Sequence, residues 1–514
     1  MNTKPSAARK ARPIDRSEGT APEEGNLGVV LVVSAALFFG VLNSSGVTVI
    51  LPAMSQAFSI DTGPLSWVMS GYLLTYGIAI PFYGRLSDKL GARPLFLAGI
   101  LLFSIGSVSC AFAPNFASML AARILQAAGG AAFPGLGMTL ASRAFPAEKR
   151  GLVLGATSAT LGLGAAVGPL VAGVLSNLLR WNAFFGMSAL VITVFPVAWR
   201  LLPRDETRTE GPFDWIGGGC MALFITGLLF AVSRVNQAGA SDPQVLVAVF
   251  FSVQGLAGLV LRQRSAPDPF IPRELVYHAR YLRLVTLGFL AALVNLAALI
   301  GFPLMLASQN GLGTFAIGLV MLPEAMGTAL CGVLAGRLVD RVGPRLPTRL
   351  GALSMLAAMV AMTFLSGASP LAIAVVAGLL GSGFALLNTP IAAIISIIVR
   401  PTALASALSM NTMVFFIGGS LGAALFSSLI AVDSTAANAW NPLYSGQAIA
   451  YSNAFAVLVF VAILAVSFVW PLPSKAMVEA EKAAEAAPDA WTPDCALPWC
   501  PDLEERCSTH EAIS

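Results

Sequence analysis

Charged residues are scarce in this sequence: Asp, Glu, Lys and Arg make up 11% of it, whereas a soluble globular domain has about 25%. A chain of 514 residues with so few charges cannot cover its own surface in water, which excludes a set of soluble domains. The net charge of +4 is small and gives no reason to expect a nucleic-acid partner. The chain has uninterrupted apolar runs instead, near the length that crosses about 30 Å of hydrocarbon. We therefore predict a polytopic membrane protein whose surroundings are the lipid bilayer.

Short alternating segments, as a closed transmembrane barrel requires, are also missing, so the predicted fold class is all-α. The first apolar run follows a polar tail and is long enough to span, so it is not interpreted as a cleavable signal. Charged residues and Pro/Gly breaks divide the chain into about fourteen transmembrane helices. The expected spans are 28–52, 65–83, 95–112, 116–141, 151–175, 182–201, 214–234, 243–262, 283–308, 314–336, 347–366, 370–398, 404–430 and 451–472.

The residue sets that carry enzyme chemistry are absent as well. We find no His pair, no Ser/His/Asp set and no Walker sequence, so we predict no enzyme, no cofactor and no ATP-driven pump. Gly162, Gly164 and Gly168 superficially look like a phosphate-binding loop, but they follow no strand and lie in an apolar run. Close helix packing explains them better.

Cysteines give no clear metal site. Cys110, Cys220 and Cys331 lie in apolar spans, where a lone thiol behaves as a small hydrophobic group. Three more precede a histidine in the C-terminal tail: Cys495, Cys500, Cys507 and His510. Four such ligands could bind zinc, but their spacing fits no familiar zinc module. We predict no metal and a reduced, disordered cytoplasmic tail.

Lys and Arg are distributed asymmetrically over the predicted loops. If both termini are cytoplasmic, nearly all of the 30 basic residues lie in the tails and the even-numbered loops. The exceptions are Arg180 and Arg234 outside, and Arg123 within a span. This is the asymmetry that the positive-inside rule describes, and an odd number of spans would break it.

A ten-residue loop occurs twice, after the second and the tenth predicted span. Gly84–Arg93 reads GRLSDKLGAR and Gly336–Arg345 reads GRLVDRVGPR, identical at six of ten positions. A duplicated loop at corresponding places in two halves is typical of transporters built from repeats. Its glycines suit tight turns, and its aspartate suits a helix N-terminus. Its arginines can pair with that aspartate or with carbonyls at a neighbouring helix end. We predict gating loops made by Gly84, Arg85, Asp88, Gly91 and Arg93, and by Gly336, Asp340, Gly343 and Arg345.

The first of these loops resembles the signature loop of the major facilitator superfamily. Arg123–Gly130 is similar to that family's Arg-x-x-Gln-Gly motif, with Ala127 in place of the usual glycine. Gly164–Gly173 resembles the antiporter motif of its exporters, through Gly164, Gly168, Pro169 and Gly173. Asn43–Pro52 resembles the first-span motif of the fourteen-span drug exporters, although Asn43 stands where an aspartate is usual and Thr48 where an asparagine is usual.

The resemblance covers residues 28–472 and implies the fourteen-span drug:proton antiporter branch. It implies an N-terminal six-helix bundle (28–201), a linker with a transmembrane hairpin (202–282) and a C-terminal six-helix bundle (283–472), flanked by cytoplasmic tails (1–27 and 473–514). It implies small-molecule substrates and protons as partners, and a cell membrane, the bacterial inner membrane, as location. Asn43 and Gln126 are expected in the substrate cavity. The second loop matches the family pattern less fully, so replacing Asp340 is expected to cost less than replacing Asp88.

Two charges are expected deep within spans. Of 26 acidic residues only Glu324 falls mid-span, and Arg123 is its counterpart of opposite sign. A charge there is costly, roughly 2.5–3.5 kcal/mol on insertion scales, so we predict that Glu324 carries the proton and that Arg123, if close, promotes its release. The alternatives are an acid that stays protonated at Glu324 and a purely structural set of bonds at Arg123. Asp214 either caps the seventh span or takes part in coupling.

The sequence thus predicts a secondary transporter that exports amphipathic drug-like or toxic compounds in exchange for protons. A uniporter or symporter for a metabolite, and a transport-inactive sensor, stay open as alternatives.

Overall fold

In the computed structural model, the residues described are 26–60, 65, 67–146, 149–204, 212–239, 241–432, 440, 444 and 446–470. Within them the chain forms helices and no strand, which confirms the all-α prediction. The helices are α1 (Leu27–Phe58), α3 (Trp67–Leu90), α4 (Ala92–Ala111), α5 (Phe116–Gly130), α6 (Phe133–Arg143), α7 (Arg150–Leu178), α8 (Ala183–Ser188), η2 (Ala189–Val194), α9 (Phe195–Leu201), α10 (Trp215–Ala238), α11 (Pro243–Ser265), α12 (Arg273–Tyr277), α13 (Ala279–Asn310), α14 (Thr314–Val342), α15 (Arg345–Leu365), α16 (Pro370–Ile398), α17 (Leu404–Val432) and α18 (Ile449–Val469).

Thirteen helical stretches in this part of the chain are long and apolar enough to cross a membrane. Helix α3 is not among them, and its last turns contain Arg85, Asp88 and Lys89. Its 24 residues nevertheless extend about 36 Å, and it packs between α5 and α17. With α3 included, the described helices agree with the expected fourteen crossings.

Two crossings are interrupted. The fourth breaks between α5 and α6, directly after Gly129-Gly130, and the sixth contains the 3₁₀ segment η2 between α8 and α9. The break expected at Asn310–Gly313 is confirmed, because α13 ends at Asn310 and Gly311 takes a φ of 63°. Glycine adopts this left-handed conformation at little cost, so it ends the helix cleanly.

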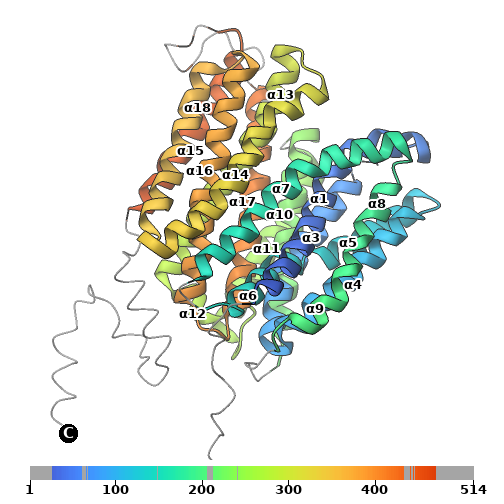
Figure 1. The fold of residues 1–514 in the computed structure, drawn as a ribbon, viewed down its shortest axis with the longest axis vertical. Helices are drawn as coiled ribbons and strands as arrows, with labels where there is room; N and C mark the ends of the chain where they lie inside the picture. Colours follow the sequence, from blue (N-terminus) through green and yellow to red (C-terminus); the bar gives the residue numbers. More distant parts are fainter. Residues whose placement is uncertain are drawn as a thin grey trace, which may run out of the picture.

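The helices form two groups (Figure 1). We call α1 and α3–α9 the first bundle, and α13–α18 the second bundle. The groups converge where α6 and α12 lie and splay apart toward their other ends (Figure 1). We call the converging end, which carries the turns at Gly91 and Gly343, the loop end, and its opposite the far end.

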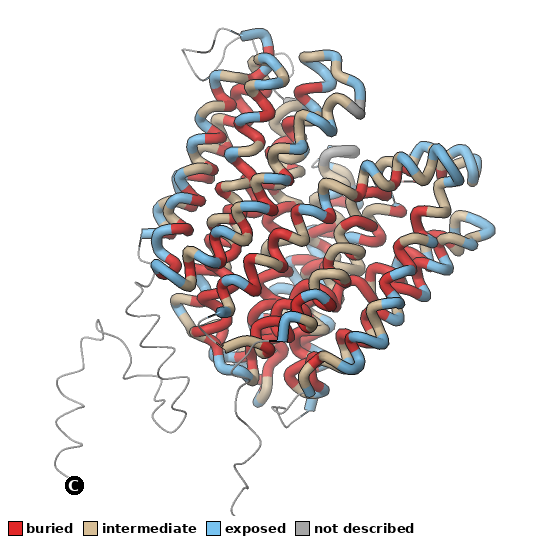
Figure 2. Tube along the Cα trace, viewed as in Figure 1, coloured by how far each residue is buried: buried red, intermediate tan, exposed pale blue. Residues whose placement is uncertain are grey.

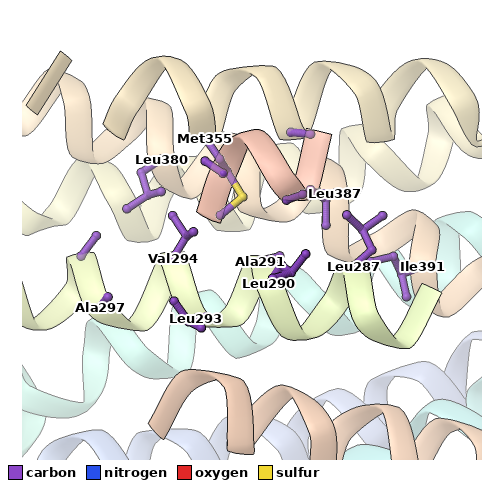
Figure 3. Packing of buried hydrophobic residues seen from close by; sticks show 14 of the residues in the cluster. Leu287, Leu290, Ala291, Leu293, Val294, Ala297, Met355, Leu380, Leu387 and Ile391 are labelled. Atoms are coloured by element: carbon purple, nitrogen blue, oxygen red, sulfur yellow. The ribbon is translucent and has the colours of Figure 1, made fainter. Parts of the chain in front are cut away.

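Each bundle has its own apolar core, and buried residues run along the middle of both (Figure 2). In the second bundle, Val294 of α13 lies toward Leu380 and Leu287 lies toward Ile391, both residues of α16 (Figure 3). Lipid tails are as apolar as these side chains, so shape-matched packing holds the helices together rather than exclusion from water.

Helices α10 and α11 form a hairpin in which α10 also packs against α3 and α17, one helix from each bundle. Asp214 caps α10 by accepting a hydrogen bond from the Gly217 N–H at 3.1 Å. It also accepts bonds from the Arg262 guanidinium at 2.9 Å and the Phe270 N–H at 3.1 Å. This confirms the predicted cap, and the same carboxylate ties the start of the hairpin to the segment that follows it.

Candidate functional site

The two repeated loops have the same backbone geometry. Gly91 has a φ of 95° and Gly343 a φ of 86°, a region that residues with a Cβ rarely adopt. The first glycine of each repeat marks a close helix approach. A Cβ on Gly84 would lie 2.5 Å from the Ser409 Cβ in α17, and one on Gly336 would lie 2.9 Å from the Leu152 Cα in α7. The shared glycines therefore serve a turn and an inter-bundle contact in both copies.

Asp88, at the end of α3, crosses from the first bundle to the second. Its side chain is 2% exposed, and it accepts a hydrogen bond of 2.5 Å from the Ser406 hydroxyl in the first turn of α17. The Arg85 guanidinium lies 3.6 Å from the same carboxylate. Because a helix N-terminus carries partial positive charge, a carboxylate at the start of α17 is stabilised there.

Asp340, at the end of α14, makes the equivalent contact in the opposite direction. Its carboxylate accepts hydrogen bonds from the Gly151 N–H at 3.1 Å and the Leu152 N–H at 2.8 Å, both in the first turn of α7. Asp340 belongs to the second bundle and α7 to the first. We call the Asp88–α17 and Asp340–α7 contacts the two latches.

Two arginines add further bonds between the bundles at the loop end. Arg143 of α6 donates to the Pro401 carbonyl, and Arg150 of α7 donates to the Ser396 carbonyl, each at 2.9 Å. In this conformation the loop end is therefore closed by charged groups bound to helix ends. Asp88 and Asp340 of the predicted gating loops thus each contact a helix of the other bundle. Their effect on transport remains a prediction.

The other basic residues of the first repeat contact neighbouring segments. Arg85 and Lys89 both donate to Asp268, which lies in the segment between α11 and α12; the Lys89 bond measures 2.9 Å. Arg93 donates to the Trp199 carbonyl and places its guanidinium 5.7 Å from that indole ring. In the second repeat, Arg345 begins α15. The first repeat thus contacts the second bundle, α9 and the segment that closes the hairpin.

Asp268 lies outside the membrane-spanning helices. Partial burial raises the pKa of Asp268, but the hydrogen bond from Lys89 and the charge of Arg85 outweigh it and lower the pKa below its usual value. Because the pKa of Asp268 is lower in the folded than in the unfolded protein, this contact stabilises the fold at every pH above the unfolded pKa. The stabilisation is lost only as the pH falls through the folded pKa. A change of pH near 7 therefore leaves the contact intact.

Replacing Asp268 is our first test of this contact. In Asp268→Asn, amide exchange in the segment between α11 and α12 should quicken by a factor of about 1.4 to 5 at pH 7, because partly exposed ion pairs contribute roughly 0.2–1 kcal/mol. Hydrogen exchange with mass spectrometry measures this, and Asp268→Glu is the matched control. Unchanged exchange in Asp268→Asn would show that the segment is held by its apolar contacts alone.

The antiporter-like motif lies where α7 packs against α1. A Cβ on Gly168 would meet the Ser45 hydroxyl, lie 2.6 Å from the Leu42 carbonyl oxygen and 3.2 Å from the Gly46 nitrogen. Gly164 is similarly close to α1, whereas a Cβ on Gly173 would meet only Val49, at 3.9 Å. Pro169 lies within the helix. The motif thus faces α1 and not lipid at Gly164 and Gly168.

Gly168→Leu should abolish most transport, because a bulky side chain forces α7 away from α1. Gly173→Leu is the matched control in the same helix, and we expect it to keep near-normal transport. Export rates of both variants, compared at equal membrane abundance, test the difference. Equal rates in the two variants would contradict the requirement for close α1–α7 packing.

Arg123 is fully buried inside the first bundle. Its guanidinium donates to the side-chain oxygens of Asn43 (Oδ1, 2.7 Å) and Gln126 (Oε1, 2.5 Å) and to the main-chain carbonyl of Val68 (3.5 Å). It also lies 4.1 Å from the centre of the Tyr72 ring. A desolvated cation over an aromatic face gains about 2 kcal/mol, which offsets part of the cost of burial.

Asn43 and Gln126 continue this network away from the second bundle. The Asn43 amide donates to the Ser188 hydroxyl at 2.9 Å, and the Gln126 amide donates to the Ser107 hydroxyl at 2.6 Å. Both side chains are fully enclosed in the first bundle in this conformation. Their predicted place in a substrate cavity stays a prediction, and it requires a conformation in which they are uncovered.

Glu324 lies in α14, in the second bundle, where it accepts a hydrogen bond of 3.3 Å from the Thr328 hydroxyl. Thr328 also donates to the Gly381 carbonyl of α16 at 3.2 Å, and it is the residue nearest to a Cβ on Gly162 of α7. Glu324 therefore lies near the meeting of three helices. Gly164 and Gly168, on the other face of α7, lie against α1 instead.

Arg123 and Glu324 do not form an ion pair in the described part of the chain. The groups that contact Arg123 all belong to the first bundle, and Thr328 belongs to the second. The expectation that Arg123 acts directly on Glu324 requires closeness, and this conformation does not provide it.

An aromatic series that the sequence did not reveal joins the two bundles. The rings of Tyr72 and Tyr76 stack with centres 5.7 Å apart, and Tyr76 meets Phe416 of α17 edge-on at 5.2 Å. Phe415 and then Phe384 of α16 continue the contacts at 5.6 and 5.8 Å. The series runs from the ring beneath Arg123 into the second bundle.

Other functional contacts were also missed from the sequence, among them Ser406, Asp268, Arg143 and Arg150. No motif marks them, because each is defined by what the repeats touch after folding. The tail with Cys495, Cys500, Cys507 and His510 lies outside the described residues.

With this geometry established, comparison with known proteins places it in context. The sequence profile described as Major Facilitator Superfamily matches residues 33–423. YhcA of Bacillus subtilis, described as an uncharacterized MFS-type transporter, is 27% identical over 320 residues, 62% of this chain and 60% of that protein. The match thus spans three fifths of that relative's length.

A second relative is the multidrug resistance protein Stp of Mycobacterium tuberculosis, 28% identical over 413 residues, 78% of this chain and 75% of its own. Among solved structures, the MFS proton:xylose symporter XylE superposes with a TM-score of 0.62 at 14% identity. That likeness covers 87% of this chain and 96% of XylE and concerns the fold alone.

Proposed function

Since the chain belongs to the Major Facilitator Superfamily, a family of membrane transporters rather than enzymes, we propose that it is a proton-coupled exporter of amphipathic small molecules. The fourteen crossings and the antiporter-like motif at Gly168-Pro169 favour the drug:proton antiporter branch. The name of the relative Stp, a multidrug resistance protein, supports the same substrate class.

The orientation that we propose places the loop end in the cytoplasm. The repeated loops are rich in Lys and Arg, and positively charged loops are retained on that side. Both termini are then cytoplasmic, and the far end faces the outside. In that orientation the conformation is outward-facing, because the two latches close the loop end and the bundles splay apart at the far end (Figure 1).

The paired latches are the observation that carries a transport cycle by alternating access. Each bundle caps a helix of the other through an aspartate, so rocking the bundles apart at the loop end must break both contacts together. The bonds are short, charge-assisted and local, so they can be broken and remade without unpacking either core. Closure at the far end would supply the compensating contacts of the opposite state.

Coupling is assigned to Glu324. A carboxyl group can bind and release a proton, and Thr328 links Glu324 to α16 and brings it near α7 of the other bundle. In the outward-facing state it would load a proton, and in the inward-facing state it would release the proton and admit substrate. Asn43 cannot ionise, so one proton per cycle is expected.

The aromatic series is the surface proposed to contact substrate. Tyr76, Phe416 and Phe384 belong to three helices and offer flat, weakly polar faces at the junction of the bundles. Such faces accept amphipathic molecules of varied shape, because they select by size and polarity and not by fixed hydrogen bonds.

One observation favours an alternative function. Asn43 takes the place of the usual first-span aspartate and is fully engaged with Arg123. Among the described residues of the first bundle the only acid is Asp88, which is engaged at the loop end. If Glu324 does not carry protons, a uniporter for an amphipathic metabolite is therefore the alternative.

Growth of a host that lacks its own efflux pumps tests the substrate class. Expression of this chain should lower sensitivity to several amphipathic toxic compounds, and expression of Gly168→Leu should not. Unchanged sensitivity across a broad panel, with the protein present in the membrane, would contradict drug export.

A further inference from the structure

The transmembrane hairpin has a groove that the transport cycle does not use. It lies between α10 and α11, has a volume of about 460 Å³ and presents a wholly apolar surface. Leu223, Thr226 and Phe230 form the α10 wall, and Pro243, Val247 and Phe251 form the α11 wall. Helix α11 packs chiefly on α10, and residues along it, such as Leu246 and Phe250, are exposed. The groove therefore opens toward lipid.

Charged side chains lie at one mouth of this groove. Arg234 is one turn beyond Phe230, and Asp242 directly precedes Pro243. Arg234 Nη2 lies 4.0 Å from an Asp242 carboxylate oxygen, at the limit for an ion pair. The Arg234 Nε is enclosed and has no hydrogen-bond partner in the described residues. The side chain as a whole is 36% exposed, so its terminal nitrogens can reach a headgroup at this mouth.

Trp67 fixes the level of this mouth in the membrane. Its ring lies 5.9 Å from that of Phe230, and its side chain is 41% exposed. Tryptophan is enriched at the boundary between hydrocarbon and headgroups. From Pro243 to Phe251 the α11 wall extends about 12 Å, which is most of the depth of one leaflet of a bilayer about 30 Å thick.

We propose that this groove holds one acyl chain of a phospholipid, with Arg234 binding its phosphate. An acyl chain gains little by leaving other chains for an apolar groove, because lipid is as apolar as the groove wall. Retention must then come from the headgroup and from fit. Arg234 and Asp242 carry opposite charges, so a zwitterionic headgroup is complementary to them. Its phosphate would contact Arg234, and its amine would contact Asp242.

Two matched pairs of variants test this. Arg234→Gln removes the phosphate donor, and Arg180→Gln removes the other basic residue expected at the far end, away from the groove. Val247→Trp fills the groove, and Val249→Trp adds the same bulk two residues along the helix. Both valines are exposed, 54% and 45%, so neither change disturbs a packed core.

The measurement is native mass spectrometry of the full-length protein in detergent, with phosphatidylethanolamine and phosphatidylglycerol added in equal amounts. We expect wild type, Arg180→Gln and Val249→Trp to retain one phosphatidylethanolamine, and Arg234→Gln and Val247→Trp to lose at least five-sixths of that occupancy. Equal retention in all five proteins would overturn the site. Preferential retention of phosphatidylglycerol would overturn the zwitterionic assignment. Displacement of the lipid by an amphipathic cation at equal concentration would assign the groove to transported compounds instead.

Discussion

Replacing Asp88 with asparagine is expected to abolish most transport while leaving membrane insertion and abundance nearly normal. Asparagine keeps the size of the side chain but removes its charge from the first turn of α17, where Ser406 donates to it. Hydrogen bonds to charged groups contribute about 1.5–3 kcal/mol, so the closed loop end should lose roughly ten- to a hundredfold in population. Initial export rates and cross-linking between cysteines placed across the loop end measure the two effects.

The second latch should respond almost as strongly. The resemblance to the family loop predicts a smaller effect for Asp340→Asn than for Asp88→Asn, because the second loop matches the family pattern less fully. The contacts give no reason for that difference, since Asp340 binds two main-chain N–H groups of α7. We therefore expect Asp340→Asn to lower transport to a similar degree, and the double variant to lower it little further.

Control variants separate charge from packing at these latches. Asp88→Glu keeps the charge and should retain part of the activity, and Ser406→Ala removes one donor but leaves the helix terminus. Wild-type export by both asparagine variants would contradict a gating role and reduce the repeats to connecting loops.

Glu324→Gln should keep substrate binding but lose accumulation driven by a pH gradient. Glutamine preserves the shape and the contact with Thr328 but cannot exchange a proton. Glu324→Asp should retain some coupling, because it shortens the side chain without removing the acid. Thr328→Val, which removes the hydroxyl and leaves the carboxyl group, should lower the rate without ending proton dependence.

The charge of transported compounds provides a second readout of the same residue. With one proton exchanged per cycle and no acid at position 43, neutral or singly cationic compounds should be exported in preference to dications. Transport of a dication at the rate of a monocation, against the same pH gradient, would show that another acid takes part.

Much of the fold could be predicted because membrane insertion imposes simple rules. Apolar runs located the helices with their ends within seven residues, and the break at Gly311 follows from glycine's backbone freedom. The α3 helix shows the limit of hydropathy, since its signature residues make it too polar to be recognised by composition alone. The charged and Pro/Gly breaks still placed a span at 65–83, which ends seven residues before the helix does at Leu90.

The sequence supplied the candidate residues but not the groups that they contact. The repeat identified Asp88 and Asp340 as important, yet their carboxylates cap helices that begin far away in the sequence, at Leu404 and Arg150. Arg123 and Glu324 were found because charges are rare in spans. Elimination could not show that Arg123 binds Asn43 and Gln126 within one bundle while Glu324 lies in the other.

Proton-driven export is the central step of the proposed mechanism, and inside-out membrane vesicles measure it directly. An imposed pH gradient, acidic inside, should drive a fluorescent amphipathic cation into vesicles that contain the wild-type protein, without added ATP. Vesicles with Glu324→Gln should show no accumulation above that of empty vesicles. Accumulation by the glutamine variant equal to wild type, or none by wild type under the imposed gradient, would contradict the proposed mechanism.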